Sequence, residues 1–132
     1  VLFRSLNLVS AHDLGKTLNP LLAEGQVQGA IAQGIGFTLM EDMGIKNGII
    51  YNRNFERYNM PRITDMPPFT SILVESNDPN GPYGAKGLAE PAFTGIPPSI
   101  ANAIYDAVGV RIKELPITPE KVLKALQEKE NK

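Results

Sequence analysis

The stretch from Gly81 to Pro91, GPYGAKGLAEP, limits the folds that this chain can adopt. Its three glycines can take backbone angles that other residues avoid, so we expect a loop here. Pro91 suits the first position of a helix, where its missing N–H costs no hydrogen bond. A loop therefore ends in this stretch and a helix begins, with Glu90 at or beside the N-cap.

Two interpretations of Glu90 are open from these residues alone. In the first, the carboxylate only complements the positive end of a helix dipole, which is the commoner role of a glutamate before proline. In the second, backbone amides, Lys86 and the carboxylate converge on a ligand at the edge of a pocket. Evidence from the rest of the sequence is needed to choose between these two interpretations.

The composition excludes several kinds of site. Among 132 residues, 13 Lys and Arg stand against 14 Asp and Glu, so no surface for nucleic acid is indicated. No apolar run reaches the ~20 residues of a membrane span, and we expect a soluble, cytoplasmic protein. Cysteine is absent, which excludes disulfides, thiolate catalysis and iron–sulfur clusters held by this chain. The single histidine, His12, cannot form a metal cluster by itself, so no metal ligands are predicted.

The first five residues, VLFRS, match the translation of a common sequencing adapter. We therefore expect residues 1–5 to be an artefact and the natural sequence to enter at Leu6, truncated at its N-terminus. A longer contiguous read with different codons upstream of Leu6 would agree with this expectation. The same VLFRS in an intact gene would contradict it.

Apolar patterns and helix-start signals predict the order of the elements. Strands are predicted over residues 6–11, 48–52, 69–75 and 110–115. Helices are predicted over residues 20 to about 42, from near Pro97 to Gly109 after a short turn, and over 118–128. These elements predict an α+β fold with a small mixed, mainly antiparallel sheet and three main helices.

The helix predicted from residue 20 has two distinct stripes. The apolar stripe, which should face the core, recurs every fourth residue: Val27, Ile31, Ile35 and Leu39. The second stripe consists of small residues: Gly25, Gly29, Ala32 and Gly36. Each interior glycine costs up to ~1 kcal/mol against alanine, so we expect something to come close to that backbone. Gln26 and Gln33 share a face; tight helix packing and solvated glutamines are the simplest interpretations.

Three motifs then follow one another: HDLGKTLNP, EGQVQGAIAQGIG, and GAKGLAEP with SIANAIYDAVGVRI behind it. In this order and spacing they resemble the C-terminal part of the molybdenum-binding large subunit of the xanthine dehydrogenase and aldehyde oxidase family. The resemblance covers nearly everything from Leu6 to Leu126. It implies that residues 6–132 are a C-terminal fragment of a molybdopterin-binding domain.

The resemblance implies roles for single residues. In that family the matching glutamate is the active-site base beside a molybdenum ion held by a molybdopterin dinucleotide, and Glu90 matches it. Gln26 matches a glutamine near the metal and the pterin, with Gln33 as a neighbour only. The segment that passes close to the pterin matches Gly84, Ala85, Lys86, Gly87 and Leu88. Ala89 departs from the pattern, because many members have Gly there, but it leaves room at the site.

The resemblance also implies an activity and partners. The reaction would be oxidative hydroxylation of a purine-like N-heterocycle or an aldehyde, with water as oxygen source and Glu90 as general base. The cofactor would be the molybdopterin dinucleotide, expected in its cytosine form. [2Fe–2S] clusters and FAD would lie on partner subunits or domains, and the intact protein would be a hetero-oligomer. The fragment alone is expected to be inactive and to expose apolar surface meant for missing partners. His12 and Asp13 also match the family but are interpreted as structural.

Two other functions stay open. The chain would be a non-catalytic module if its Gly81–Pro91 loop and helix N-terminus only bind a nucleotide or phosphate. It would be a packing domain without a ligand if it only fills a place in an oligomer. Molybdenum analysis of the intact gene product tests the first alternative, and the reading frame upstream of Leu6 tests the second.

Overall fold

The computed structural model describes residues 5–131, so most of the VLFRS segment lies outside the described residues. The elements, in chain order, are β1 (Leu8–Asp13), α1 (Pro20–Leu39), β2 (Ile45–Lys46), β3 (Ile49–Ile50), β4 (Phe69–Val74), α2 (Ala89–Thr94), α3 (Ile96–Val108) and α4 (Pro119–Glu130). Short 3-10 turns lie at Ile63–Asp65 and Pro82–Gly84. The predicted α+β class and the three main helices are confirmed, and α2 is the short turn expected before the main helix.

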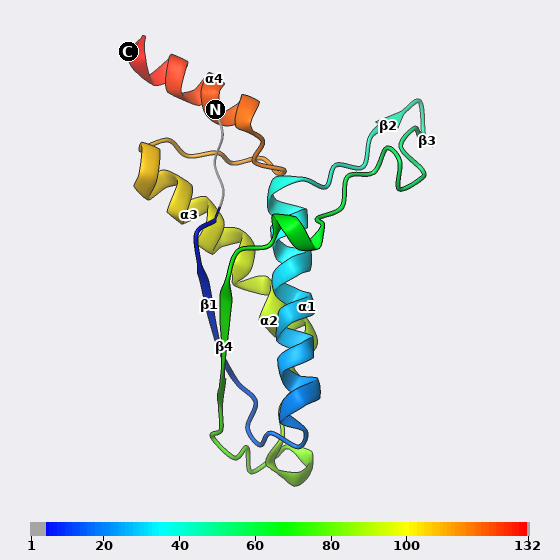
Figure 1. Ribbon diagram of the computed structural model, residues 1–132, viewed down its shortest axis with the longest axis vertical. Helices are drawn as coiled ribbons and strands as arrows, with labels where there is room; N and C mark the ends of the chain where they lie inside the picture. Colours follow the sequence, from blue (N-terminus) through cyan, green and yellow to red (C-terminus); the bar gives the residue numbers. More distant parts are fainter. Residues whose placement is uncertain (1–4, 132) are drawn as a thin grey trace.

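The longer strand pairing is parallel, so the prediction of a mainly antiparallel sheet was wrong. β1 pairs with β4 from Leu8 opposite Phe69 to Asp13 opposite Val74. The helix α1 lies between them in sequence and carries the chain back, so β4 starts at the same end as β1 (Figure 1). Among the described residues, only the two-residue strands β2 and β3 pair antiparallel, in a separate hairpin. Asn47 and Gly48 close that hairpin with φ of 51° and 75°, as a type I′ turn requires.

Local capping explains where the helices begin and end. The Asn19 side chain accepts a hydrogen bond from the Leu22 N–H, and Thr118 does the same for Lys121, at the predicted starts of α1 and α4. Gly109 ends α3 in the left-handed conformation, as predicted. The end of α1 was placed about three residues too late, because the N–H groups of Met40 and Glu41 both return to the Gly36 carbonyl.

The strand predicted over residues 110–115 is not formed. This segment is an irregular link between α3 and α4. Its apolar side chains are covered by helices instead of a neighbouring strand: Val110 packs with Ile117 and Val122 in a small cluster that attaches α4. The backbone of Ile117 donates to the Thr38 carbonyl at the end of α1, which ties this link to the centre of the molecule.

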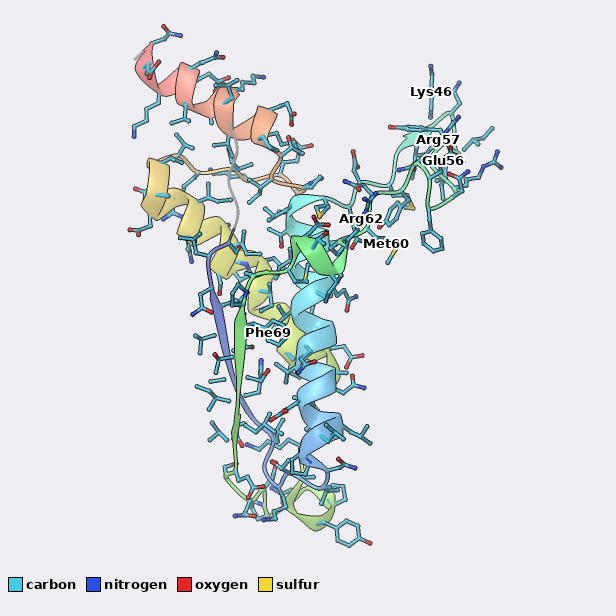
Figure 2. The ribbon with its side chains drawn as sticks, viewed as in Figure 1. Lys46, Glu56, Arg57, Met60, Arg62 and Phe69 are labelled. Atoms are coloured by element: carbon cyan, nitrogen blue, oxygen red, sulfur yellow. The ribbon has the colours of Figure 1, made fainter. Side chains whose placement is uncertain are left out.

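The main core forms around the apolar stripe of α1, as predicted. Val27, Ile31 and Ile35 are buried against α2 and α3, which contribute Ala92, Ile96 and Ile100. Figure 1 shows β1 and β4 side by side along α1. Their inner face adds partly buried side chains, among them Phe69 at the start of β4 (Figure 2). Helix α1 is therefore held from both sides, by the strand pair and by α2 and α3.

The glycines of α1 divide into two kinds. A Cβ on Gly34 would lie 2.6 Å from the Cβ of Ile96, so α3 can approach only because the side chain is absent. Gly36 is similarly crowded by Pro61 and Glu41. At Gly25 and Gly29, nothing within the described chain lies within 4 Å of an added Cβ. The expected close approach is therefore met at Gly36, whereas two glycines of the predicted stripe face open space.

Apolar surface is exposed, as expected, and part of it lies where the chain projects from the helices. The β2–β3 hairpin and the segment after it extend away from α1, with Lys46, Glu56 and Arg57 towards the far end (Figure 2). Phe55 in this projection is 84% exposed, and Ile45 and Ile49 are also exposed. No helix in the described part of the chain is long and apolar enough to cross a membrane.

The two kinds of glycine predict opposite effects on stability. Gly34→Ala should lower the free energy of unfolding by ~1–3 kcal/mol. The added methyl would clash with the Cβ of Ile96, and a change of rotamer cannot move that atom. Gly25→Ala, in the same helix, should raise it by up to about 1 kcal/mol, because the added methyl meets nothing and favours helix. Urea unfolding followed by circular dichroism measures both. Equal effects of the two substitutions would contradict this account of the core.

Candidate functional site

A pocket of about 400 Å³ lies between α1 and α2 and is open to solvent on one side. It brings together Gln26 and Glu90, the two residues that the sequence singled out most firmly. Gln33, expected only as a neighbour, lines the same pocket. The complete lining is Gln26, Gly29, Ala30, Gln33, Ala89, Glu90 and Phe93.

Helical spacing explains why α1 presents these side chains together. Gln26, Gly29, Ala30 and Gln33 follow the i, i+3, i+4, i+7 pattern of one helix face. The neighbouring face of α1 carries the buried stripe and packs on Ala92 of α2. Because Gly29 has no side chain, the floor of the pocket is bare backbone. The packing that builds the core thus also fixes the distance between the two walls.

Glu90 lies inside the first turn of α2, not at its N-cap. The N-cap is Leu88, whose carbonyl accepts from the Ala92 N–H at 3.3 Å, so the helix begins before Pro91. The expected start was about two residues too late. Within the described residues, neither the Glu90 carboxylate nor the Gln26 amide makes a side-chain hydrogen bond or an ion pair, so both are available to a ligand.

Phe93 is a wall of the pocket that the sequence interpretation missed. Its ring meets Phe37 of α1 edge-on, with centroids 5.7 Å apart and planes at 68°. Such a T-shaped pair fixes both rings. The available signal was its position three residues after Glu90, on the same face of a short helix. Phe93 gives the pocket one apolar, aromatic side beside its amides and carboxylate.

The predicted loop residues Gly84, Ala85, Lys86, Gly87 and Leu88 do not line this pocket. Gly84 has φ of 80° and packs near Lys16 and Asn77. Leu88 packs against the main core, and nothing approaches an added Cβ on Gly87. Their contact with a cofactor stays a prediction.

The described residues, 5 to 131, contain no group of three or more His, Cys, Asp or Glu side chains placed to hold a metal ion. A metal at this pocket would therefore have to arrive with ligands that are not protein side chains of this part of the chain. A metal carried by an organic cofactor meets that condition.

Comparison with known proteins decides the family. Residues 2–67 match the sequence model of the molybdopterin cofactor-binding domain. The chain belongs to this family. Gln26 lies within the matched residues, whereas Glu90 lies beyond them.

Individual members extend the similarity over most of the chain. A xanthine dehydrogenase molybdenum-binding subunit from Escherichia coli O157:H7 is 44% identical over 117 residues, 87% of this chain and 16% of that protein. Quinoline 2-oxidoreductase from Pseudomonas putida 86 has a TM-score of 0.83 at 32% identity, covering 91% of this chain and 16% of that one. Aldehyde oxidoreductase from Desulfovibrio gigas has 0.81 at 39% identity, covering 90% and 13%.

These matches confirm the resemblance to the xanthine dehydrogenase and aldehyde oxidase family. The similarity covers only a small part of these relatives: the chain spans 16% of the length of the xanthine dehydrogenase subunit it matches. The pocket residues fit one wall of a pterin site. Two amides can pair with the polar edge of a pterin, the bare backbone at Gly29 permits close approach, and the open side leaves room for a larger group.

Asp13, at the end of β1, organises the loops beside the pocket. Its Oδ1 accepts from the Gly15 N–H at 2.8 Å, its Oδ2 from Lys86 Nζ at 2.6 Å, and both oxygens from the Ser76 hydroxyl. These donors, Lys86 first and then Gly15, hold the pKa of Asp13 well below its usual range. The same bond raises the pKa of Lys86. These contacts agree with the structural role expected for Asp13.

A second set of contacts joins the same two loops. The Lys86 N–H donates to the Leu14 carbonyl at 2.8 Å, and the Asn77 N–H donates to the Gly15 carbonyl at 2.8 Å. A Cβ on Gly15, whose φ is 66°, would collide with the Gly84 carbonyl oxygen. His12, in contrast, lies on the other face of β1, where its Nε2 is 2.7 Å from the Ser10 hydroxyl.

The depressed pKa of Asp13 predicts how stability depends on pH. Below about pH 4 the unfolded chain takes up a proton at this carboxyl before the folded chain does. The stability that Asp13 contributes is therefore present above pH ~4 and is lost as pH falls towards the folded-state pKa. We expect Asp13→Asn to be only slightly less stable than the unchanged chain at pH 7, because its ion pair lies near water, and the difference to shrink below pH ~4.

Urea midpoints measured from neutral to acid pH check this expectation. Asp106→Asn is the matched control, because it removes an exposed carboxylate of α3 that has no ion pair among the described residues. Its effect should be small at neutral pH. A difference between Asp13→Asn and the unchanged chain that stays constant with pH would contradict the role assigned to Asp13.

Proposed function

We propose that this chain forms one wall of the active site of a xanthine dehydrogenase-like molybdenum hydroxylase, with Glu90 as its general base. The observation that carries the proposal is the single pocket that holds Gln26 and Glu90, both without partners in the described chain. The family supports it independently, because its members bind a molybdopterin cofactor. The reaction would hydroxylate an N-heterocycle such as a purine, or an aldehyde, with the oxygen taken from water.

In this proposal the residues of the pocket have different roles: binding the cofactor, excluding water and accepting a proton. Gln26 would bind the cofactor through its amide, and Gln33 lies beside Gln26. Because Gly29 has no side chain, the cofactor could approach the helix backbone there. Phe93 would keep water from the apolar side of the pocket. The bound cofactor supplies the two-electron redox chemistry of molybdenum. The ionised carboxylate of Glu90 would accept, at an Oε atom, the proton lost by the water that provides the oxygen.

The rest of the enzyme would come from outside this chain. The chain covers 16% of the xanthine dehydrogenase subunit that it matches, and that relative is named a molybdenum-binding subunit. We infer that further segments supply the opposite wall of the site, and that partner subunits in a cytoplasmic hetero-oligomer carry the [2Fe–2S] clusters and FAD. The same proposal includes three further points. The cofactor would have the cytosine dinucleotide form, residues 84–88 would contact it, and this chain alone would be inactive.

Glu90→Gln in the complete gene product is the direct test. Turnover should fall by about 10²- to 10⁴-fold, since a general base contributes about that much, while molybdenum and pterin content stay unchanged. Glu24→Gln is the matched control, because it neutralises an exposed glutamate of α1 that does not line the pocket. Turnover near normal in Glu90→Gln, with full metal content, would remove Glu90 as the base.

Gln26 and Gln28 offer a matched pair for cofactor binding. They lie two residues apart on α1, but only Gln26 lines the pocket. Gln26→Ala should lower retention of the cofactor roughly tenfold, as expected when a ligand group loses one hydrogen-bond partner. Gln28→Ala should leave it unchanged. Molybdenum per protein, measured by elemental analysis after dialysis, gives the answer, and equal loss in both variants would count against this wall as the cofactor site.

A further inference from the structure

We propose that Asp13 is a positioning residue for Glu90, acting through its ion pair with Lys86. The pair would fix the segment that leads into α2, and with it the place of the Glu90 carboxylate in the pocket. This inference rests on the proposed function for its catalytic consequence. The structural tie itself can be measured without any turnover.

The segment between the glycine loop and α2 has few anchors of its own. Residues 85–88 form no regular structure, and Gly87 has nothing within 4 Å of an added Cβ. Leu88 packs against the main core, and Lys86 supplies the polar anchors. Its N–H bonds to the Leu14 carbonyl at 2.8 Å and its Nζ bonds to Asp13 at 2.6 Å. Lys86 is thus the last residue before α2 with polar ties to the strands, four positions before Glu90.

Asp13 is in turn fixed to the sheet. It stands opposite Val74 at the end of the parallel pair, and its carboxylate also accepts from the Gly15 N–H and the Ser76 hydroxyl. A carboxylate bonded from three segments cannot turn without breaking several bonds. The Asp13 carboxylate therefore gives Lys86 Nζ a well-held acceptor at the end of the strand pair.

The Asp13–Lys86 ion pair is partly exposed to water, so its effect on the position of Glu90 can be measured apart from its small effect on folding stability. The side chains of Lys86 and Asp13 are 36% and 39% exposed, and ion pairs near water add little to folding stability. A neighbouring pair provides the comparison. Lys16 and Glu75, 3.1 Å apart and 47% and 36% exposed, also join the turn after β1 to the chain after β4. Neither residue lies on the segment that leads to Glu90.

The experiment compares Asp13→Asn with Glu75→Gln in the complete gene product with its cofactor bound. The first readout is amide hydrogen exchange of peptides covering residues 84–90. We expect faster exchange there in Asp13→Asn and unchanged exchange in Glu75→Gln. The second readout is kinetic: kcat should fall ~10- to 100-fold in Asp13→Asn, as for a misplaced catalytic group, with KM and molybdenum content near normal. Glu75→Gln should retain kcat.

Two further variants protect the test against simple misfolding. Lys86→Met leaves the bonds of Asp13 to Gly15 and Ser76 in place and should reproduce the faster exchange expected in Asp13→Asn. Lys86→Arg keeps the cation and should restore slow exchange over residues 84–90. Unchanged exchange over residues 84–90 in both Asp13→Asn and Lys86→Met would overturn the inference. Normal turnover in Glu90→Gln would overturn the proposed function instead, while the exchange readout would still decide whether Asp13 holds the segment.

Discussion

The parallel pairing of β1 with β4 is the constraint on which the site depends. Because the two strands run in the same direction, their carboxyl ends meet at one edge. The turn after β1 and the loop after β4 leave from that edge together. Asp13 and Lys86 can therefore bond although they stand 73 positions apart in the sequence. An antiparallel pairing would send these two loops to opposite ends of the strands and separate the carboxylate from the loop that leads to Glu90.

Helix α1 serves the core and the pocket at once. Val27 and Ile31 are fully buried on one face, and burial of such side chains contributes ~1.5–3 kcal/mol each. The adjacent face carries Gln26 and the open backbone of Gly29. Since α2 packs on the buried face through Ala92, the wall bearing Glu90 is held by the same apolar contacts. Within the described residues, the two walls of the pocket are therefore held together by apolar contacts and not by side-chain hydrogen bonds of Gln26 or Glu90.

Local features of the fold could be predicted from the sequence, and distant pairings could not. The starts of α1 and α4 follow from Asn19 and Thr118, whose capping bonds span three residues. The buried stripe of α1 follows from its spacing. The direction of the β1–β4 pair and the missing strand at 110–115 depend on what covers each segment, which no local pattern contains. Gln26 and Glu90 came from the family resemblance, whereas Phe93 and the partner of Lys86 became visible only in three dimensions.

The Asp13–Lys86 bond also bears on the order in which the molecule assembles. Contacts between residues far apart in sequence form late, because the entropy of closing the intervening chain is lost before any bond compensates for it. Here α1 and the strand pair must be in place before the loop after β4 has anything to bind. The tie between Asp13 and the segment that leads to Glu90 therefore forms once β1 and β4 lie side by side.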